Sequence, residues 1–172
     1  MNEAINWFLA NTYTWTAILA IILGIIRKPV GMNRYANTLR FLFLLYAGIA
    51  FAWSGYFHLM LPNFTAAKIG WAPSPFQFEV GLSNLGCAIL GFMAFFRKNS
   101  YLWLGAILSI GIFTVGAGFG HVYQMLIENN TAISNSGLIM YTDIIVPIIM
   151  LFLWFKADAD NDTNKSKEVL PS

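Results

Sequence analysis

Residues 101–127 read YLWLGAILSIGIFTVGAGFGHVYQMLI, an apolar run without a single Lys, Arg, Asp or Glu. A helix needs about 20 predominantly apolar residues to cross the hydrocarbon core of a bilayer. No water is present there, so the backbone N–H and C=O groups must bond to one another within the segment, as they do in a helix. This run therefore predicts a transmembrane helix.

Four further apolar stretches reach or approach the same length. They are approximately residues 5–26, 41–61, 76–96 and 138–155. Of the 172 residues, 58% are hydrophobic and 10% are charged, whereas a soluble domain carries about 25% charged residues. We expect an all-α integral membrane bundle of five transmembrane helices, a four-helix core plus an N-terminal helix, within residues 1–155. Residues 156–172 are polar and are expected to be a disordered cytoplasmic tail.

Basic residues are distributed unevenly between the loops. The first and third loops hold Arg27, Lys28, Arg34 and Arg40, and Arg97 and Lys98, respectively. The second loop holds only Lys68, and the fourth holds no basic residue. The positive-inside rule then places the first and third loops and the C-terminus in the cytoplasm, and the N-terminus outside. The net charge of +2 gives no sign of a nucleic-acid partner.

Four titratable side chains lie inside the apolar segments, on four different helices. Glu79 and Asp143 are the only charged groups there, and the chain's two histidines, His58 and His121, complete the set. At 1.5 Å per residue, each lies about 5–10 Å below the outer boundary of the hydrocarbon. Such groups are costly in a membrane and are rarely retained without a partner or a task. This layer is the expected functional site.

Other polar residues lie at a similar depth and are expected to bind a ligand beside this layer: Ser54, Asn84, Tyr123, Gln124 and Tyr141. Small residues in the run Gly116–Gly120 let a neighbouring helix approach closely, which would bring His121 toward a facing carboxylate. The second loop, residues 61–75, holds Trp71 and three prolines. We expect this loop to fold back on the outer interface as a lid.

Three interpretations of the site remain open. In the leading one, two imidazoles and two carboxylates hold Zn²⁺ or a non-haem iron or manganese ion, in a redox-related protein that acts on a small or lipidic molecule. In the second, a metal-free pocket binds or transports an amphipathic ligand such as a lipid or a quinone. In the third, the polar groups only fix the helices in register. Haem is less expected, because carboxylates at this depth are not needed for it.

Several short runs resemble an uncharacterised family of small bacterial membrane proteins, itself loosely similar to the DoxX-like four-helix group. They are Gly55–His58, Pro73–Gly81, Asn84–Gly86, Gly120–Gln124 and Tyr141–Asp143. The resemblance covers roughly residues 40–155. It implies a four-helix core in the bacterial inner (plasma) membrane, with the first helix as an addition. It implies no established reaction, so catalysis, the ligand and the oligomeric state stay open.

Overall fold

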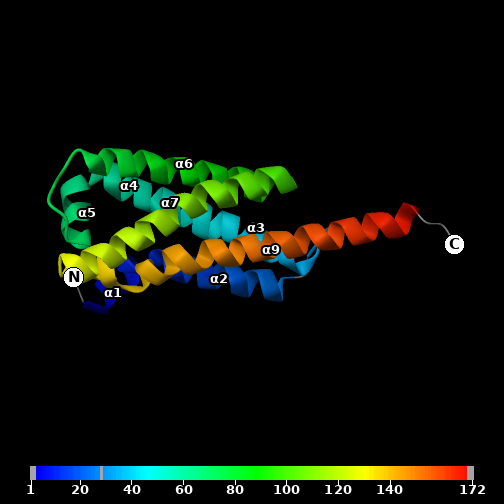
Figure 1. Cartoon of the computed structure of the whole chain (residues 1–172), viewed down its shortest axis with the longest axis horizontal. Coiled ribbons are helices and arrows are strands. Elements are labelled where there is room, and N and C mark those ends of the chain that lie inside the picture. Colours follow the sequence, from blue (N-terminus) through cyan, green and yellow to red (C-terminus); the bar gives the residue numbers. More distant parts are fainter. Residues whose placement is uncertain (1–2, 28, 170–172) are drawn as a thin grey trace.

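Every secondary-structure element in the computed structural model, which describes residues 3–27 and 29–169, is a helix (Figure 1). The elements are α1 Glu3–Ala10, α2 Thr12–Ile26, α3 Arg34–Leu42, the π-helix η1 Phe43–Ala50, α4 Phe51–Met60, α5 Pro62–Ile69, α6 Phe76–Phe96, α7 Ser100–Ile127, α8 Ile133–Ser136 and α9 Leu138–Val169. By length and composition, the described residues contain four helices that can cross a membrane, or five if α1 and α2 form one span. The predicted all-α membrane bundle is confirmed.

The first predicted span is not a straight helix. It breaks between α1 and α2, whose axes differ by 65°. Asn11 lies at the break with its side chain fully buried. Its amide nitrogen donates to the Trp7 carbonyl at 2.7 Å, and its amide oxygen accepts from the Leu138 backbone N–H at 3.1 Å. The bend is therefore tied to the start of α9.

The second span begins earlier than predicted. The segments α3, η1 and α4 form one continuous helix of 27 residues, Arg34–Met60, where the sequence predicted a start near residue 41. Asn33 caps it by accepting from the Ala36 N–H at 2.8 Å. In its middle, η1 packs closely on α6, because a Cβ added at Gly91 would lie 2.6 Å from the Gly48 nitrogen.

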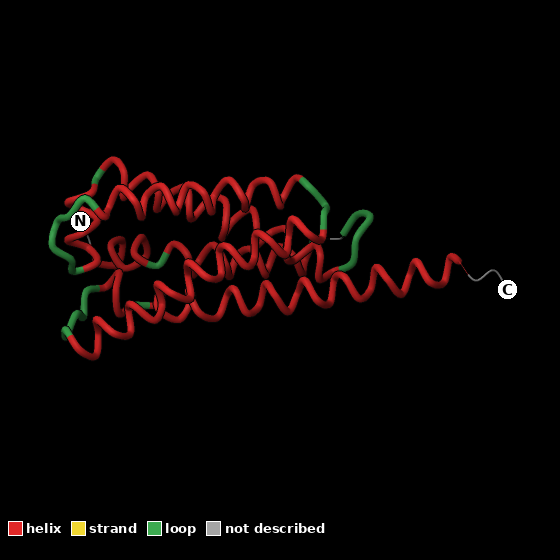
Figure 2. Tube along the Cα trace, turned by 45° about the horizontal axis from the view of Figure 1, so that its top comes forward, coloured by secondary structure: helices red, strands yellow, loops and turns green. Residues whose placement is uncertain are grey.

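The helices pack tightly at one end of the bundle and diverge at the other. Helix α7 pairs with α9, while α6 packs mainly on α4 and η1 and touches α7 less. In Figure 1, α7 begins beside the end of α6 and moves away from it toward the end where α5 lies. We call that end the α5 end, and the opposite one, where α2 ends and α3 begins, the α3 end. The loops gather toward these two ends (Figure 2).

The middle of the bundle and its α3 half are filled by an apolar core. Its members include Phe43, Trp103, Ile107, Ile110, Met150 and Leu153. Helix α9 continues past this core and projects from the α3 end (Figures 1 and 2). It runs to Val169, although a disordered tail was expected from residue 156. No Gly or Pro lies between residues 156 and 169 to end the helix.

Candidate functional site

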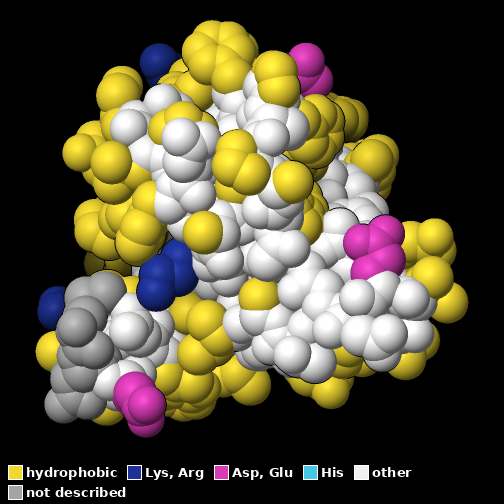
Figure 3. All heavy atoms as spheres, turned by 90° about the vertical axis from the view of Figure 1, so that its left-hand side faces the viewer, with side chains coloured by type: hydrophobic (Ala, Val, Ile, Leu, Met, Phe, Trp, Pro, Cys, Tyr) yellow, Lys and Arg dark blue, Asp and Glu magenta, His cyan; other side chains and the backbone are white. Residues whose placement is uncertain are grey.

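The diverging helices enclose a cavity of about 680 Å³ at the α5 end. This volume lies in the range of small-molecule sites, about 300–1,000 Å³. Its walls are mainly apolar and aromatic, with Phe51, Phe57, Phe64, Trp71, Phe113 and Ile139 among the lining residues. Figure 3 shows this end of the molecule, where hydrophobic side chains surround polar and backbone atoms and few charges are seen. The cavity therefore suits a molecule that is largely apolar.

The structure gathers most of the predicted polar residues around this cavity. The lining residues from the predicted set are Ser54, His58, Asn84, His121, Gln124 and Asp143. They come from α4, α6, α7 and α9, so the expected layer joins four separate segments of the chain.

Glu79, Tyr123 and Tyr141 do not line the cavity. Glu79 is exposed in the first turn of α6, and both tyrosines are 57% exposed. Glu79 lies two residues after Gln77, and Tyr123 lies two residues after His121. Tyr141 lies two residues before Asp143. Gln77, His121 and Asp143 face inward. Two residues correspond to about 200° of helical rotation, so the side chains of Glu79, Tyr123 and Tyr141 point outward. Their predicted depth in the membrane stays a prediction, and their predicted orientation toward the site differs from the observed one.

The expected set of four metal ligands is therefore not brought together. In the part of the chain that the structure describes, no three His, Cys, Asp or Glu side chains lie close enough to hold an ion. Glu79 faces away, and His58 bonds to Gln77 rather than to a carboxylate. Only His121 and Asp143 approach each other.

His58 lies in the last turn of α4 and is buried. Its Nδ1 lies 2.6 Å from Gln77 Oε1. An amide oxygen only accepts hydrogen bonds, so Nδ1 carries a proton, and in the neutral ring Nε2 is then an acceptor. Gly81 allows this contact between helices, because a Cβ there would lie 2.7 Å from Leu59 Cγ and 3.2 Å from His58 Cβ.

His121 and Asp143 form the central pair. Asn135 Oδ1 lies 2.8 Å from His121 Nδ1, which must therefore be the donor. His121 Nε2 faces Asp143 Oδ2 at 3.8 Å, the only ion pair among the described residues. A neutral imidazole Nε2 and a carboxylate both accept, so their approach is favourable when one of the two groups carries a proton. At 3.8 Å they are too far apart for a direct hydrogen bond, which leaves room for a donor from a third molecule.

The segment between α4 and α6 covers the cavity and is held there by hydrogen bonds. Trp71 Nε1 donates to Gln124 Oε1 at 2.5 Å. Asn130 Nδ2 donates to the same oxygen and to the Ile69 carbonyl, both at 2.9 Å. The expected fold-back of this loop is thus a short helix, α5, followed by a tryptophan that is tied to the end of α7.

A family match spans residues 7–163 and carries the description family of unknown function, DUF6790. The chain belongs to DUF6790. No curated protein and no solved structure matches it. The matched region reaches further toward the N-terminus than the resemblance at residues 40–155, so the first helices belong to the family as well. Similarity to DoxX-like proteins and a bacterial origin stay predictions.

Sequence reasoning about this DUF6790 chain missed two polar residues of α2 and α6. Tyr13 donates from its hydroxyl to Asn84 Oδ1 at 2.8 Å, and Gln77 holds His58. The sequence contains a pattern from which Gln77 could have been found. Together with Gly81, Asn84 and Gly91, it follows the 3.6-residue repeat along one face of α6. Small and polar residues on one face of a membrane helix indicate a helix contact.

Asn135 was missed as well, and no signal pointed to it. It lies in the four-residue helix α8, which no periodicity reveals. Its contact with His121 depends on how the loop after α7 folds back.

Proposed function

We propose that this protein binds a small amphipathic molecule with a hydroxyl head, a lipidic alcohol or a hydroquinone, in the cavity at the α5 end. The observation that carries this proposal is the gap of 3.8 Å between His121 Nε2 and Asp143 Oδ2 inside an apolar cavity of about 680 Å³. The apolar body of the ligand would lie against the aromatic wall. Its head would lie between His58, His121 and Asp143.

The polar groups of the cavity favour a ligand that donates hydrogen bonds. His58 Nε2 is left as an acceptor by the bond to Gln77. Asp143 is 5% exposed, and no described side chain lies within direct hydrogen-bonding distance of its carboxylate. A buried polar group without a partner is unfavourable by about 1–3 kcal/mol, more when it is charged. A ligand hydroxyl that donates to Asp143 would relieve this penalty.

The apolar core that fills the α3 half of the bundle favours a binding function over transport. The core around Trp103, Ile107 and Met150 closes the cavity toward the α3 end. A transporter would need a polar path through this half. By the positive-inside rule, the basic α3 end faces the cytoplasm and the cavity faces outward, in the plasma membrane. The ligand would then enter from the outer leaflet.

The test is binding of tritiated geranylgeraniol to detergent-purified protein, in competition with unlabelled geranylgeraniol or its methyl ether. The two competitors differ only at the oxygen, where a methyl group replaces the hydroxyl hydrogen and removes the donor. We expect the alcohol to compete at least about tenfold better, since a hydrogen bond to a charged group contributes about 1.5–3 kcal/mol. Asp143→Asn should remove most of that preference.

Glu79→Gln is the matched control, because it also neutralises a carboxylate but at an exposed position. It should leave binding unchanged. Equal competition by alcohol and ether, or equal losses in Asp143→Asn and Glu79→Gln, would contradict the proposal.

A further inference from the structure

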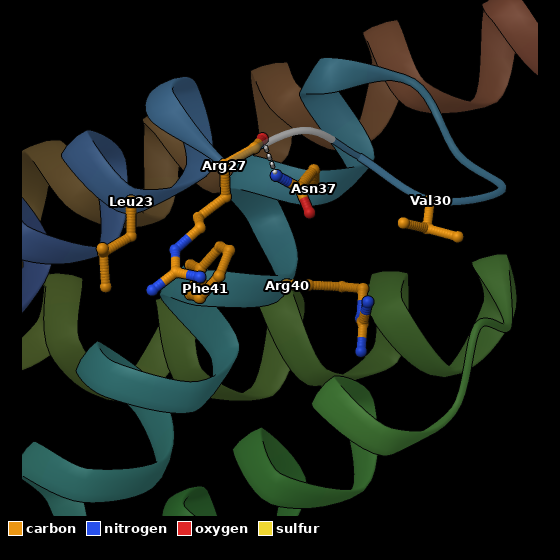
Figure 4. Close-up of a pocket in the computed structure, with 6 residues that line it drawn as sticks. All are labelled: Leu23, Arg27, Val30, Asn37, Arg40 and Phe41. Carbon is orange, nitrogen blue, oxygen red and sulfur yellow. Dashed lines mark hydrogen bonds between the residues drawn. The ribbon is translucent and has the colours of Figure 1, made fainter.

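A second cavity, of about 360 Å³, lies at the α3 end, remote from the His121–Asp143 pair. Its lining residues are Leu23, Arg27, Val30, Asn37, Arg40 and Phe41 (Figure 4). Leu23 belongs to α2, Arg27 and Val30 to the connection that follows it, and Asn37, Arg40 and Phe41 to α3. The lining thus combines two guanidinium groups with apolar side chains and contains no carboxylate.

Asn37 fixes the back wall of this cavity. Its side-chain nitrogen donates to the Gly24 carbonyl at 3.0 Å and to the Arg27 carbonyl at 3.2 Å, the latter drawn in Figure 4. Gly24 packs on Thr38 so closely that an added Cβ would lie 2.6 Å from Thr38 Oγ1. The end of α2 is therefore held against α3, and the backbone that carries Arg27 has a fixed position.

Arg40 is oriented by contacts with α6. Its Nε donates to the Phe95 carbonyl at 3.1 Å, and its guanidinium carbon lies 4.8 Å from the centre of the Phe95 ring. The Cα atom of Arg40 lies about 9 Å along the helix axis from that of Arg34. Its side chain reaches back to the last turn of α6, as a long basic side chain does near a membrane interface. Its Nη1 makes a long contact of 3.9 Å with Met32 Sδ, and its Nη2 has no hydrogen bond with the described residues. A phosphate oxygen is a stronger acceptor than a thioether sulfur, and the planar guanidinium matches its geometry.

Positive charge at this end is not balanced by described acidic side chains. Arg27 is exposed, and its guanidinium has no hydrogen bond or ion pair with the described residues. Arg34, Arg97 and Lys98 are exposed at the same end. The described carboxylate here, Asp158, accepts from Ser100 Oγ at 2.8 Å rather than pairing with an arginine. A local excess of positive charge attracts anionic lipid head groups.

We propose that this cavity binds an anionic phospholipid, with its phosphate between Arg27 and Arg40 and the first part of an acyl chain against Leu23 and Phe41. In Figure 4 the Arg27 guanidinium lies toward the Phe41 ring, and Arg40 extends from the other side of Phe41. Free phosphate would use the guanidinium groups but not the apolar wall. A phospholipid uses both, and this cavity lies where a span enters the membrane.

Native mass spectrometry of delipidated protein tests this site with phosphatidylglycerol and phosphatidylcholine that carry the same acyl chains. We expect the wild type to retain phosphatidylglycerol preferentially. Arg27→Gln and Arg40→Gln should each weaken that retention about fivefold, since each basic residue near the surface contributes about 1 kcal/mol to anionic-lipid binding. Arg34→Gln, which removes an exposed charge outside the cavity lining, should have little effect.

Arg40→Gln also loses the bond to Phe95, so Arg27→Gln carries the test if Arg40→Gln does not fold. Equal retention of the two lipids by the wild type would overturn the proposal. An equal loss in Arg34→Gln and Arg27→Gln would show a diffuse charge effect and would overturn it too. Thermal stabilisation by inorganic phosphate as large as that by phosphatidylglycerol would show a soluble-anion site instead, against the lipid assignment.

Discussion

At the scale of single residues, Asp143 governs the chemistry of the cavity. A buried carboxylate without donors is strongly unfavourable unless it shares a proton or gains a partner. His121 Nε2 lies 3.8 Å from this carboxylate, so one proton on either group makes the pair attractive, yet the two atoms are too far apart for a direct hydrogen bond. The pair is thus neutral as a whole and still able to accept a hydrogen bond from a ligand. This combination explains how an ionisable group persists at this buried position.

Gln77 is expected to matter for stability, and Glu79, two residues away, is not. Gln77 is 1% exposed and bonds to His58, whereas Glu79 is exposed. Gln77→Ala leaves the His58 donor without its partner, so the free energy of unfolding should fall by about 1–3 kcal/mol. Glu79→Ala should change it by less than about 0.5 kcal/mol. Unfolding in detergent, followed by circular dichroism, measures both, and a larger effect of Glu79→Ala would contradict the assigned faces.

The position of the site residues along their helices could be read from the sequence, whereas the face of the helix on which each lies could not always be read. His58, His121, Asn84 and Asp143 lie on the cavity as the sequence indicated. Distance from the helix end fixes depth, because the rise per residue is constant. To predict which way a side chain points, the rotation of each helix about its own axis must also be known. That rotation depends on the helices packed against it, which the sequence does not specify. Glu79 and the two outward tyrosines were placed on the wrong face for this reason.

At the scale of elements, the crossing of α7 and α9 sets the distance between His121 and Asp143. Gly118 lies at the contact: an added Cβ would be 2.8 Å from Ile144 Cγ1 and 3.4 Å from Asp143 Cβ. Gly116 and Gly120 face open space, with nothing within 4 Å. Among the glycines of this run, Gly118 is therefore the one that permits the close contact between α7 and α9.

Gly118→Ala should push α7 and α9 apart. Overpacking a tight contact costs about 1–3 kcal/mol, and the separation of His121 from Asp143 should weaken ligand binding as well. Gly116→Ala is the matched control and should be neutral or stabilising by up to about 1 kcal/mol, because alanine favours a helix over glycine. Thermal unfolding of both variants in detergent provides the measurement. Equal behaviour of the two variants would show that this contact is not close.

Element boundaries were predictable where strong signals mark them. Helix α6 was predicted to run over residues 76–96, as observed, because Pro75 precedes it and Arg97 follows it. The start of α3 was missed because its first turns are polar. The break at Asn11 was missed because neither Gly nor Pro marks it. It depends on a hydrogen bond to α9, more than one hundred residues away in the sequence.

At the scale of the whole molecule, the two ends of the bundle have different chemistry. The α5 end holds a largely apolar cavity of about 680 Å³ with the His121–Asp143 pair, and the α3 end holds a basic cavity of about 360 Å³. A filled apolar core separates them. This division favours a binding protein anchored by lipid at one end and open to its ligand at the other.

The most direct test of the central claim is native mass spectrometry of the protein as it is extracted from the membrane, beside Ala117→Phe. Ala117 lines the cavity, so a phenylalanine there should fill it. We predict that the wild type carries one lipidic alcohol or hydroquinone and that Ala117→Phe loses it while its melting temperature stays close to that of the wild type. A wild type that carries only detergent and bulk phospholipid, or a variant that retains the same ligand, would contradict the claim that this cavity is the binding site.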